Sequence, residues 1–202
     1  MGEDKTVRVG RRLVLASTSP RRTDLLRQLG LRFEVVDPGQ AENSSSTDAE
    51  TRVRENSLSK GRAVAEGLGD GVVIAADTVV LLDEKILEKP RDASDAVNML
   101  QTLSDRVHTV VSAVTVIDVP SRKEDTRVVR TRVKIRNLTE DQVEAYVASG
   151  EPLDKAGAYA AQGLGSVLIE WVDGCFYNVV GLPLSLLYDM LRAVGIDVLK
   201  NN

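Results

Sequence analysis

A segment rich in serine and arginine follows the first apolar run of this chain, and its residue types suit the binding of an anion. Ser17 and Ser19 supply hydroxyl groups, and Pro20 suits the first position of a helix. Arg21 and Arg22 then place two guanidinium groups in the first helical turn, where unpaired N–H groups and the positive end of the helix dipole already lie. Because basic residues oppose that dipole, the pattern favours a phosphate cradle; a capped helix with two surface arginines is the alternative.

Two carboxylates could supply the chemistry that a bound phosphate undergoes. Asp77 comes directly after the apolar run 72–76, at the carboxyl edge of the expected sheet, where open α/β sheets bind their ligands. There it could hold a divalent cation or accept a proton from an attacking water, although such an aspartate is often only a turn or cap residue. Glu42 lies in a polar loop, where it is either solvent-exposed or a second carboxylate for the same metal.

Three further polar residues stand in settings that could position a substrate. Lys60 lies in the middle of an expected helix, and Lys89 precedes Pro90, which holds it in an extended conformation. Gln162 lies among small residues in 157–165, which would let a ligand approach, and its amide could contact a base edge. The alternative for the two lysines is that they are solvated surface residues. The alternative for 157–165 is a tight strand–turn–strand connection.

The elements that must position these side chains alternate between strands and helices, which is typical of an α/β fold. Strands are expected over 13–16, 31–36, 72–76 continuing through 79–82, 85–87, 107–118, 126–136 and 167–172. Helices are expected over 22–29, 48–66, 94–103, 139–149 and 183–194, with a loop over 178–184. Thr139 and Gln142 have the spacing of a capping box, and Gly150 would end that helix. The central pair of long strands is expected to form a second lobe.

Composition narrows the class of protein. With 202 residues the chain can form one sizeable domain, or one domain with two lobes, and bury roughly 70% of its unfolded surface. Its net charge of −4 argues against a general nucleic-acid binder, and no apolar run has the length of a membrane span. A single cysteine, Cys175, and a single histidine, His108, exclude an internal disulfide and a multi-histidine metal site; both side chains are expected to be packed. The polar start without a signal-peptide core favours the cytoplasm.

Six motifs in order resemble the Maf family, the septum-formation-inhibitor-like nucleoside triphosphate pyrophosphatases. They are Ala16–Arg22, Lys60 in its helix, Ala75–Val80, Leu87–Pro90, Asp154–Tyr159 with Gln162, and Asn178–Pro183. The resemblance implies an elongated, two-lobed α/β fold with a mixed sheet, similar to inosine-triphosphate pyrophosphatases, with the active site in a cleft between the lobes. One such domain would occupy 13–202 after a polar extension over 1–12, and a homodimer is common in the family.

The resemblance also implies a reaction, a cofactor and site residues. Members cleave nucleoside triphosphates between the α- and β-phosphates with Mg²⁺ or Mn²⁺, which removes selected nucleotides from the cellular pool. Asp77 would be the proton acceptor and, with Glu42, a metal ligand. The phosphates would be held by Ser17, Ser19, Arg21, Arg22, Lys60 and Lys89.

The resemblance also implies a preference for certain bases, and the chain departs from the family pattern at two positions. The subgroup that prefers dTTP and UTP resembles this chain at Arg21, Thr78 and Gln162, whereas the subgroup that prefers 7-methyl-GTP tends to have Gln where Thr78 stands. Ala41 replaces a frequent aspartate beside Glu42, and Gly61 replaces a frequent alanine, which should loosen its helix by about 0.5–1 kcal/mol. A non-catalytic, nucleotide-sensing regulator of cell division is the rival hypothesis.

Overall fold

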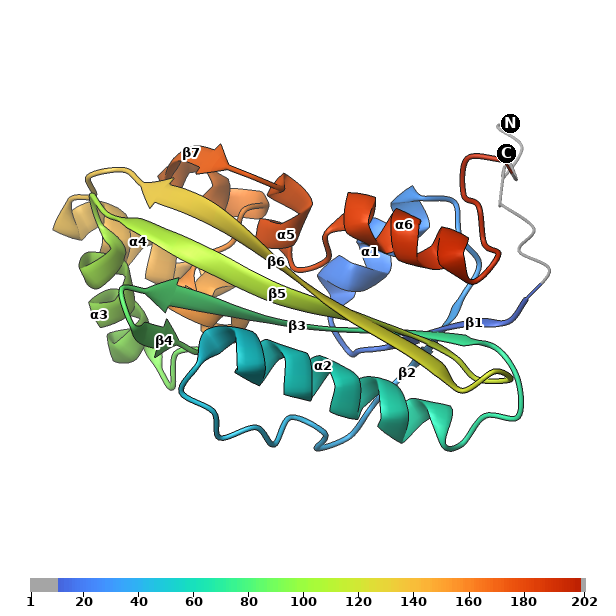
Figure 1. The fold of residues 1–202 in the computed structure, drawn as a ribbon. Helices are drawn as coiled ribbons and strands as arrows, with labels where there is room; N and C mark the ends of the chain where they lie inside the picture. Colours follow the sequence, from blue (N-terminus) through green and yellow to red (C-terminus); the bar gives the residue numbers. More distant parts are fainter. Residues whose placement is uncertain (1–10, 201–202) are drawn as a thin grey trace. The chain divides into compact units, whose positions relative to one another are not determined.

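A computed structural model describes residues 11–200, whose strands belong to one mixed sheet in the order β2-β1-β3-β5-β6-β7, with β4 paired to β3 (Figure 1). The strands are β1 Leu13–Ala16, β2 Glu34–Val36, β3 Val72–Leu82, β4 Lys85–Leu87, β5 Val107–Asp118, β6 Lys123–Ile135 and β7 Ile169–Asp173. The helices are α1 Pro20–Gln28, α2 Ala49–Ala65, α3 Ala93–Leu103, α4 Glu140–Ala148, α5 Phe176–Val180 and α6 Leu184–Ala193, with 3₁₀ turns at Glu151–Asp154, Ala156–Ala158 and Gly163–Leu168. The expected α/β class with a mixed sheet is confirmed.

The described chain divides into two compact units. The first contains the described part of Met1–Asp77, Ala113–Val128 and the described part of Gly181–Asn202, and the second contains Thr78–Ser112 and Val129–Val180. Strands β3, β5 and β6 each contribute residues to both units. None of the helices in the described part is long and apolar enough to cross a membrane.

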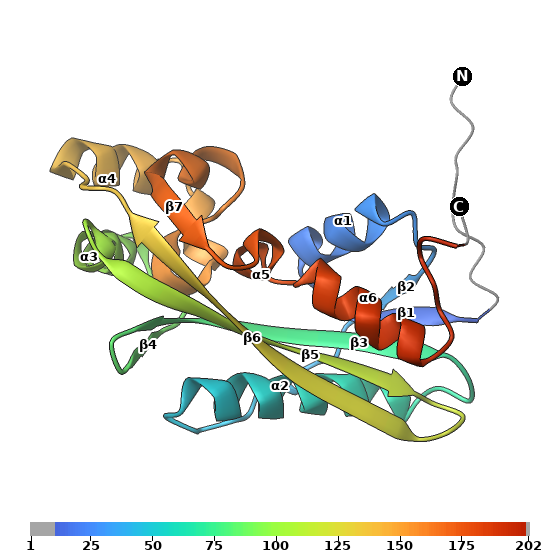
Figure 2. The ribbon, with the colours of Figure 1, turned by 45° about the horizontal axis from the view of Figure 1, so that its top comes forward.

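In the first unit, short parallel strands lie between helices. Strand β1 pairs in parallel with β2 and β3, and all four of its residues are buried. Helix α2 covers one face of these strands, while α1 and α6 cover the other (Figures 1 and 2). A Cβ on Gly61 of α2 would lie 3.0 Å from the Cδ1 of Ile117 on β5, so the glycine that departs from the family pattern lets this helix pack closely on the sheet.

The second unit contains the parts of β3, β5 and β6 that do not belong to the first unit. It also contains α3 and α4, which pack against each other. Its buried core includes Leu100 of α3, Val133 of β6 and Tyr146 of α4. Helix α4 begins with the expected capping box, in which Thr139 and Gln142 each accept a hydrogen bond from the other's backbone N–H. Gly150 follows that helix with φ +75°, a left-handed conformation that glycine adopts at low cost.

Several boundaries differ from those expected. Strand β2 covers only Glu34–Val36, and β7 begins at Ile169 because the preceding residues form a 3₁₀ turn. Residues 157–165 do not form a strand–turn–strand connection, since the positive φ of Gly157 and Ala158 interrupts an extended chain. Part of the expected loop over 178–184 belongs to α5, which is too short to leave a periodic pattern. Most of the polar extension over 1–12 lies outside the described residues.

Candidate active site

The β1–α1 junction fixes the position of one arginine of the expected phosphate cradle. Ser17 is 3% exposed, and its Oγ accepts hydrogen bonds of 3.2 Å from the backbone N–H of Ser19 and from the Nη1 of Arg22. The Nε of Arg22 also donates to the carbonyl oxygen of Gly181, at 2.9 Å. Ser19 is the N-cap of α1, but its side chain forms no capping bond. Both serines are thus held at the start of a helix that has Pro20 in its first turn.

Charge balance around Arg22 favours an additional anion. Burial lowers the pKa of Arg22, and the positive charge of Arg21 adds to this lowering, while the negative charges of Asp77 and Glu42 oppose it. The first turn of α1 contains no acidic residue. A phosphate placed near this turn would therefore interact favourably with two guanidinium groups and with the helix dipole.

Lys60 joins the two candidate metal-binding carboxylates. Its side chain is 5% exposed, and its Nζ lies 2.8 Å from the Oδ1 of Asp77 and 2.5 Å from the Oε1 of Glu42. The same ammonium donates to the carbonyl oxygen of Ala76 at 3.4 Å. Because an ammonium has three N–H donors, these three acceptors account for all of them. Lys60 therefore places one positive charge from within the protein beside both carboxylates.

Asn56 is a site neighbour that the sequence reasoning missed. Its Nδ2 donates to the Oδ2 of Asp77 at 3.1 Å, and its Oδ1 accepts from the backbone N–H of Ser44 at 3.0 Å. Asn56 and Lys60 are four residues apart on α2 and so lie on the same face of the helix. This spacing is the sequence signal that could have identified Asn56 as a neighbour of the site. One helix face therefore holds both oxygens of Asp77 and also fixes the polar loop that contains Glu42.

Asp77 lies inside a strand rather than directly after one, which corrects the sequence interpretation. Strand β3 continues to Leu82 because its second half pairs with β4 in antiparallel register. Its parallel neighbour β1 ends at Ala16, opposite Ala75, so Asp77 lies just beyond the end of that strand. The carboxylate is therefore still at the carboxyl edge of the parallel pair, where α/β sheets bind ligands.

The two carboxylates fit a divalent cation. Asp77 and Glu42 already converge on one positive centre, the ammonium of Lys60, and both offer the hard oxygen ligands that Mg²⁺ and Mn²⁺ prefer. Mg²⁺ commonly uses one or two carboxylates together with substrate phosphates and water. In the described part of the chain, no group of three or more His, Cys, Asp or Glu residues could hold a metal ion. The remaining ligands would therefore have to come from elsewhere, with triphosphate oxygens the natural choice.

Three predicted substrate residues belong to the second unit. Thr78 is partly buried, and its Oγ1 lies 2.8 Å from the Oγ of Ser112 on β5. Lys89 is exposed between two fixed neighbours, since the carbonyl oxygen of Glu88 accepts from Gly157 at 3.0 Å and Pro90 is buried. Gln162 is also exposed. Thus the first unit contains Ser17, Arg22, Lys60, Asp77 and Glu42, and the second unit contains these three residues.

The backbone around Gln162 is fixed by a single carboxylate. Glu151 accepts hydrogen bonds from the backbone N–H groups of Leu164 and Gly165, at 3.0 and 2.8 Å, and from the hydroxyl of Tyr146 at 3.0 Å. Burial alone would raise the pKa of Glu151, but these bonds and the charge of Lys155 together lower it below its ordinary value. Gly165 packs so closely that a Cβ there would lie 2.5 Å from the carbonyl oxygen of Ala160. Gln162 therefore stands at the start of an anchored turn.

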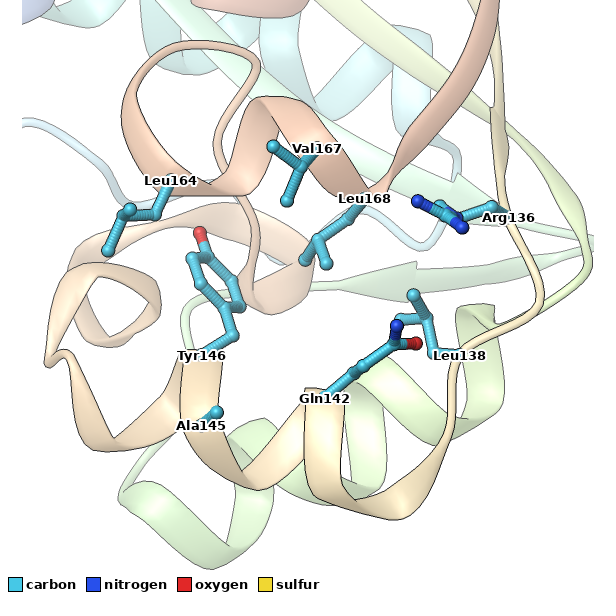
Figure 3. Close-up of a pocket in the computed structure, with 8 residues that line it drawn as sticks. All are labelled: Arg136, Leu138, Gln142, Ala145, Tyr146, Leu164, Val167 and Leu168. Atoms are coloured by element: carbon cyan, nitrogen blue, oxygen red, sulfur yellow. The ribbon is translucent and has the colours of Figure 1, made fainter.

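A separate pocket of about 270 Å³ in the second unit is mostly apolar (Figure 3). Its lining residues are Arg136, Leu138, Gln142, Ala145, Tyr146, Leu164, Val167 and Leu168. None of them is a predicted substrate residue, and the amide oxygen of Gln142 is already used by the α4 capping box. This pocket therefore contains none of the predicted site residues.

Comparison with known proteins assigns the chain to a family. A family model described as Maf-like protein matches residues 12–194. The chain belongs to the Maf family. This Maf protein is 46% identical over 192 residues to the dTTP/UTP pyrophosphatase of Dictyoglomus turgidum, with 93% of this chain and 98% of that protein covered. It is 47% identical over 189 residues to the dTTP/UTP pyrophosphatase of Moorella thermoacetica, with 93% and 97% covered.

A solved structure supports the expected fold. The Ham1 protein of Staphylococcus aureus aligns with this Maf protein at a TM-score of 0.50 and 15% sequence identity. The alignment covers 91% of this chain and 100% of that chain. At this level of identity the likeness concerns the fold alone.

Proposed function

We propose that this Maf protein hydrolyses dTTP and UTP to the corresponding monophosphate and pyrophosphate. The observation that carries the proposal is the contact of Asp77 and Glu42 with Lys60, in the same compact unit as the Ser17–Arg22 cradle. Relatives 46% and 47% identical over almost their whole length have the name dTTP/UTP pyrophosphatase, which supports the same substrates here.

In the proposed mechanism, Asp77 accepts a proton from water as the water oxygen attacks the α-phosphorus. The bond from that phosphorus to the bridging oxygen breaks, and its electron pair leaves with pyrophosphate. Arg21 and Arg22 offset the negative charge that develops on the leaving group. Asp77 and Glu42 would hold a divalent cation, which would supply positive charge to neutralise the phosphates and orient the triphosphate.

Lys60 has a role in addition to binding phosphate. Its donors are directed at protein acceptors, so it can reach a phosphate only if one of these contacts opens. Glu42, whose side chain is 59% exposed against 10% for that of Asp77, is the more exposed of the two carboxylate partners. We therefore propose that Lys60 holds Asp77 in place and exchanges Glu42 for a phosphate oxygen when substrate and metal bind.

Base recognition is assigned to Arg21, Thr78 and Gln162, and Lys89 and the two serines complete the phosphate contacts. The anchored turn that follows Gln162 supports this role because a fixed backbone limits the positions that the Gln162 side chain can adopt. The cytoplasmic location, the homodimer and the cleft between lobes stay predictions.

The test is pyrophosphate release from a panel of nucleoside triphosphates with Mg²⁺ or Mn²⁺. Asp77→Asn is expected to lower kcat by at least about 100-fold, as loss of a general base does. Asp105→Asn, which removes an exposed carboxylate in the second unit, is the matched control and should keep normal turnover. Near-normal activity of Asp77→Asn would refute the assignment of the base. Nucleotide binding without any release of pyrophosphate by the unmodified chain would support the rival regulator instead.

A further inference from the structure

Two side chains, one from α4 and one from the 3₁₀ turn that follows it, contact the backbone on both sides of Gln162. After Gln162, the carboxylate of Glu151 accepts hydrogen bonds from two successive backbone N–H groups, at 3.0 and 2.8 Å. Before Gln162, the hydroxyl oxygen of Tyr146 accepts from the backbone N–H of Ala160 at 3.2 Å. Ala160 and Ala161 are buried, whereas Gln162 is exposed. The segment that carries Gln162 is therefore held at two points.

Tyr146 and Glu151 also bond to each other, which makes them a single clamp. The hydroxyl of Tyr146 donates to the Oε1 of Glu151 at 3.0 Å. The direction of each bond is fixed, because a backbone N–H can only donate and an ionised carboxylate can only accept. Burial and the hydrogen bond to Glu151 raise the pKa of Tyr146, so the hydroxyl keeps its proton at neutral pH. The ring of Tyr146 extends from α4 towards the segment that carries Leu164 (Figure 3).

Two glycines leave the space that the Tyr146–Glu151 clamp occupies. A Cβ on Gly163 would lie 2.5 Å from the Oε2 of Glu151. A Cβ on Gly165 would lie 2.6 Å from the hydroxyl oxygen of Tyr146. Because contacts this short are not tolerated, the close approach of the turn to the clamp depends on both glycines. The residues after Gln162 are thus fitted to the clamp by packing as well as by hydrogen bonds.

We propose that Tyr146 and Glu151 are positioning residues for base selection, because they hold the backbone on both sides of Gln162 and so limit where its amide can meet a base. This proposal rests on the proposed function, in which Gln162 contacts the base. The amide has both donors and an acceptor, so a mobile amide could bond to the edges of several bases. A fixed backbone permits fewer placements and favours one base. The clamp acts through Gln162 and not by contact with the nucleotide.

Changes in the clamp should alter base choice. Tyr146→Phe keeps the ring in the core but releases the backbone before Gln162. The ratio of kcat/KM for UTP to that for GTP should then fall about 3- to 10-fold, the range expected for the loss of one hydrogen bond. Glu151→Gln places an amide NH₂ group among backbone donors and should lower the ratio at least as much. Gln162→Ala sets the limit of the effect, because the clamp acts only through that side chain.

The decisive measurement repeats Tyr146→Phe in a Gln162→Ala background. Because the clamp acts through the Gln162 side chain, the second substitution should no longer alter the ratio of UTP to GTP. A purely structural role would instead lower the use of both nucleotides alike in either background. Tyr188→Phe is the matched control, because it removes another tyrosine hydroxyl that donates to a carboxylate, that of Asp197 in the first unit at 3.2 Å.

The outcomes separate this proposal from the proposed function. Equal use of UTP and GTP by the unmodified chain, an unchanged ratio in Tyr146→Phe, the same loss in Tyr188→Phe, or an undiminished effect in the Gln162→Ala background would overturn the proposal. If Glu151→Gln does not fold by circular dichroism, Tyr146→Phe decides alone. Dissociation constants for UTP and GTP from calorimetry give the same ratio without turnover. A chain whose binding ratio depends on Tyr146 only when Gln162 is present, but which releases no pyrophosphate, would contradict only the proposed function.

Discussion

The buried histidine gives this protein a predictable dependence of stability on pH. His108 is 2% exposed, and its Nε2 lies 2.7 Å from the hydroxyl oxygen of Tyr159. Burial lowers the pKa of His108 from its ordinary 6.5 to about 4. The folded protein thus binds this proton less readily than the unfolded chain. The stability that His108 contributes is complete above pH 6.5 and is lost as the pH falls towards 4.

The size of the effect follows from the difference between the two pKa values. From pH 8 to pH 5 the free energy of unfolding should fall by about 2 kcal/mol, and the loss should approach about 3 kcal/mol below pH 4. His108 is the only histidine in the chain, so no other histidine contributes. The carboxylates of Glu34 and Asp118, whose pKa values are lowered from 4.5 and 3.8 by hydrogen bonds to Arg12 and Arg11, act at lower pH.

Urea unfolding followed by circular dichroism, at intervals from pH 5 to pH 8, measures this slope. His108→Gln removes the titrating group. In this variant the free energy of unfolding should change little from pH 5 to pH 8, whatever its absolute value. Tyr159→Phe is the control, because it removes the hydrogen bond but leaves His108 in place, and it should retain the slope. A flat curve for the unmodified chain, or equal slopes with and without His108, would refute the reasoning.

Four further variants test other contacts. Lys60→Met leaves the buried Asp77 uncompensated and should lower the free energy of unfolding by about 3–5 kcal/mol in urea titrations, with much of the loss recovered when Asp77→Asn is added. Thr139→Ala should cost about 1 kcal/mol in the same assay, because it removes the N-cap of α4. Glu151→Gln should raise KM for UTP with a smaller change in kcat, since it loosens the turn at Gln162. Gln162→Ala should reduce the ratio of UTP to GTP turnover, whereas an unchanged ratio in steady-state assays would count against its contact with the base.

Sequence alone could predict the elements whose signals are local. The α4 capping box depends on Thr139 and Gln142, three residues apart, and Pro20 begins α1 as expected. Cys175 was expected to be packed but is partly exposed, because exposure depends on residues distant in sequence. The same reason explains why the contact between Lys60 and Asp77 could not be derived from their spacing: it depends on how α2 lies against β3. The residue types of the site could be predicted, but not their pairing.

The placement of Lys60 has a consequence for the folding of this protein without a metal ion. Proteins whose ligands repel one another until a metal binds often fold only in its presence. Here an internal ammonium already lies between Asp77 and Glu42, so the fold carries its own cation at that position. In the proposed function a divalent cation would therefore serve the reaction and not the architecture. The melting temperature should hardly change when a chelator is added, and under the proposed function the cation would arrive together with each nucleotide.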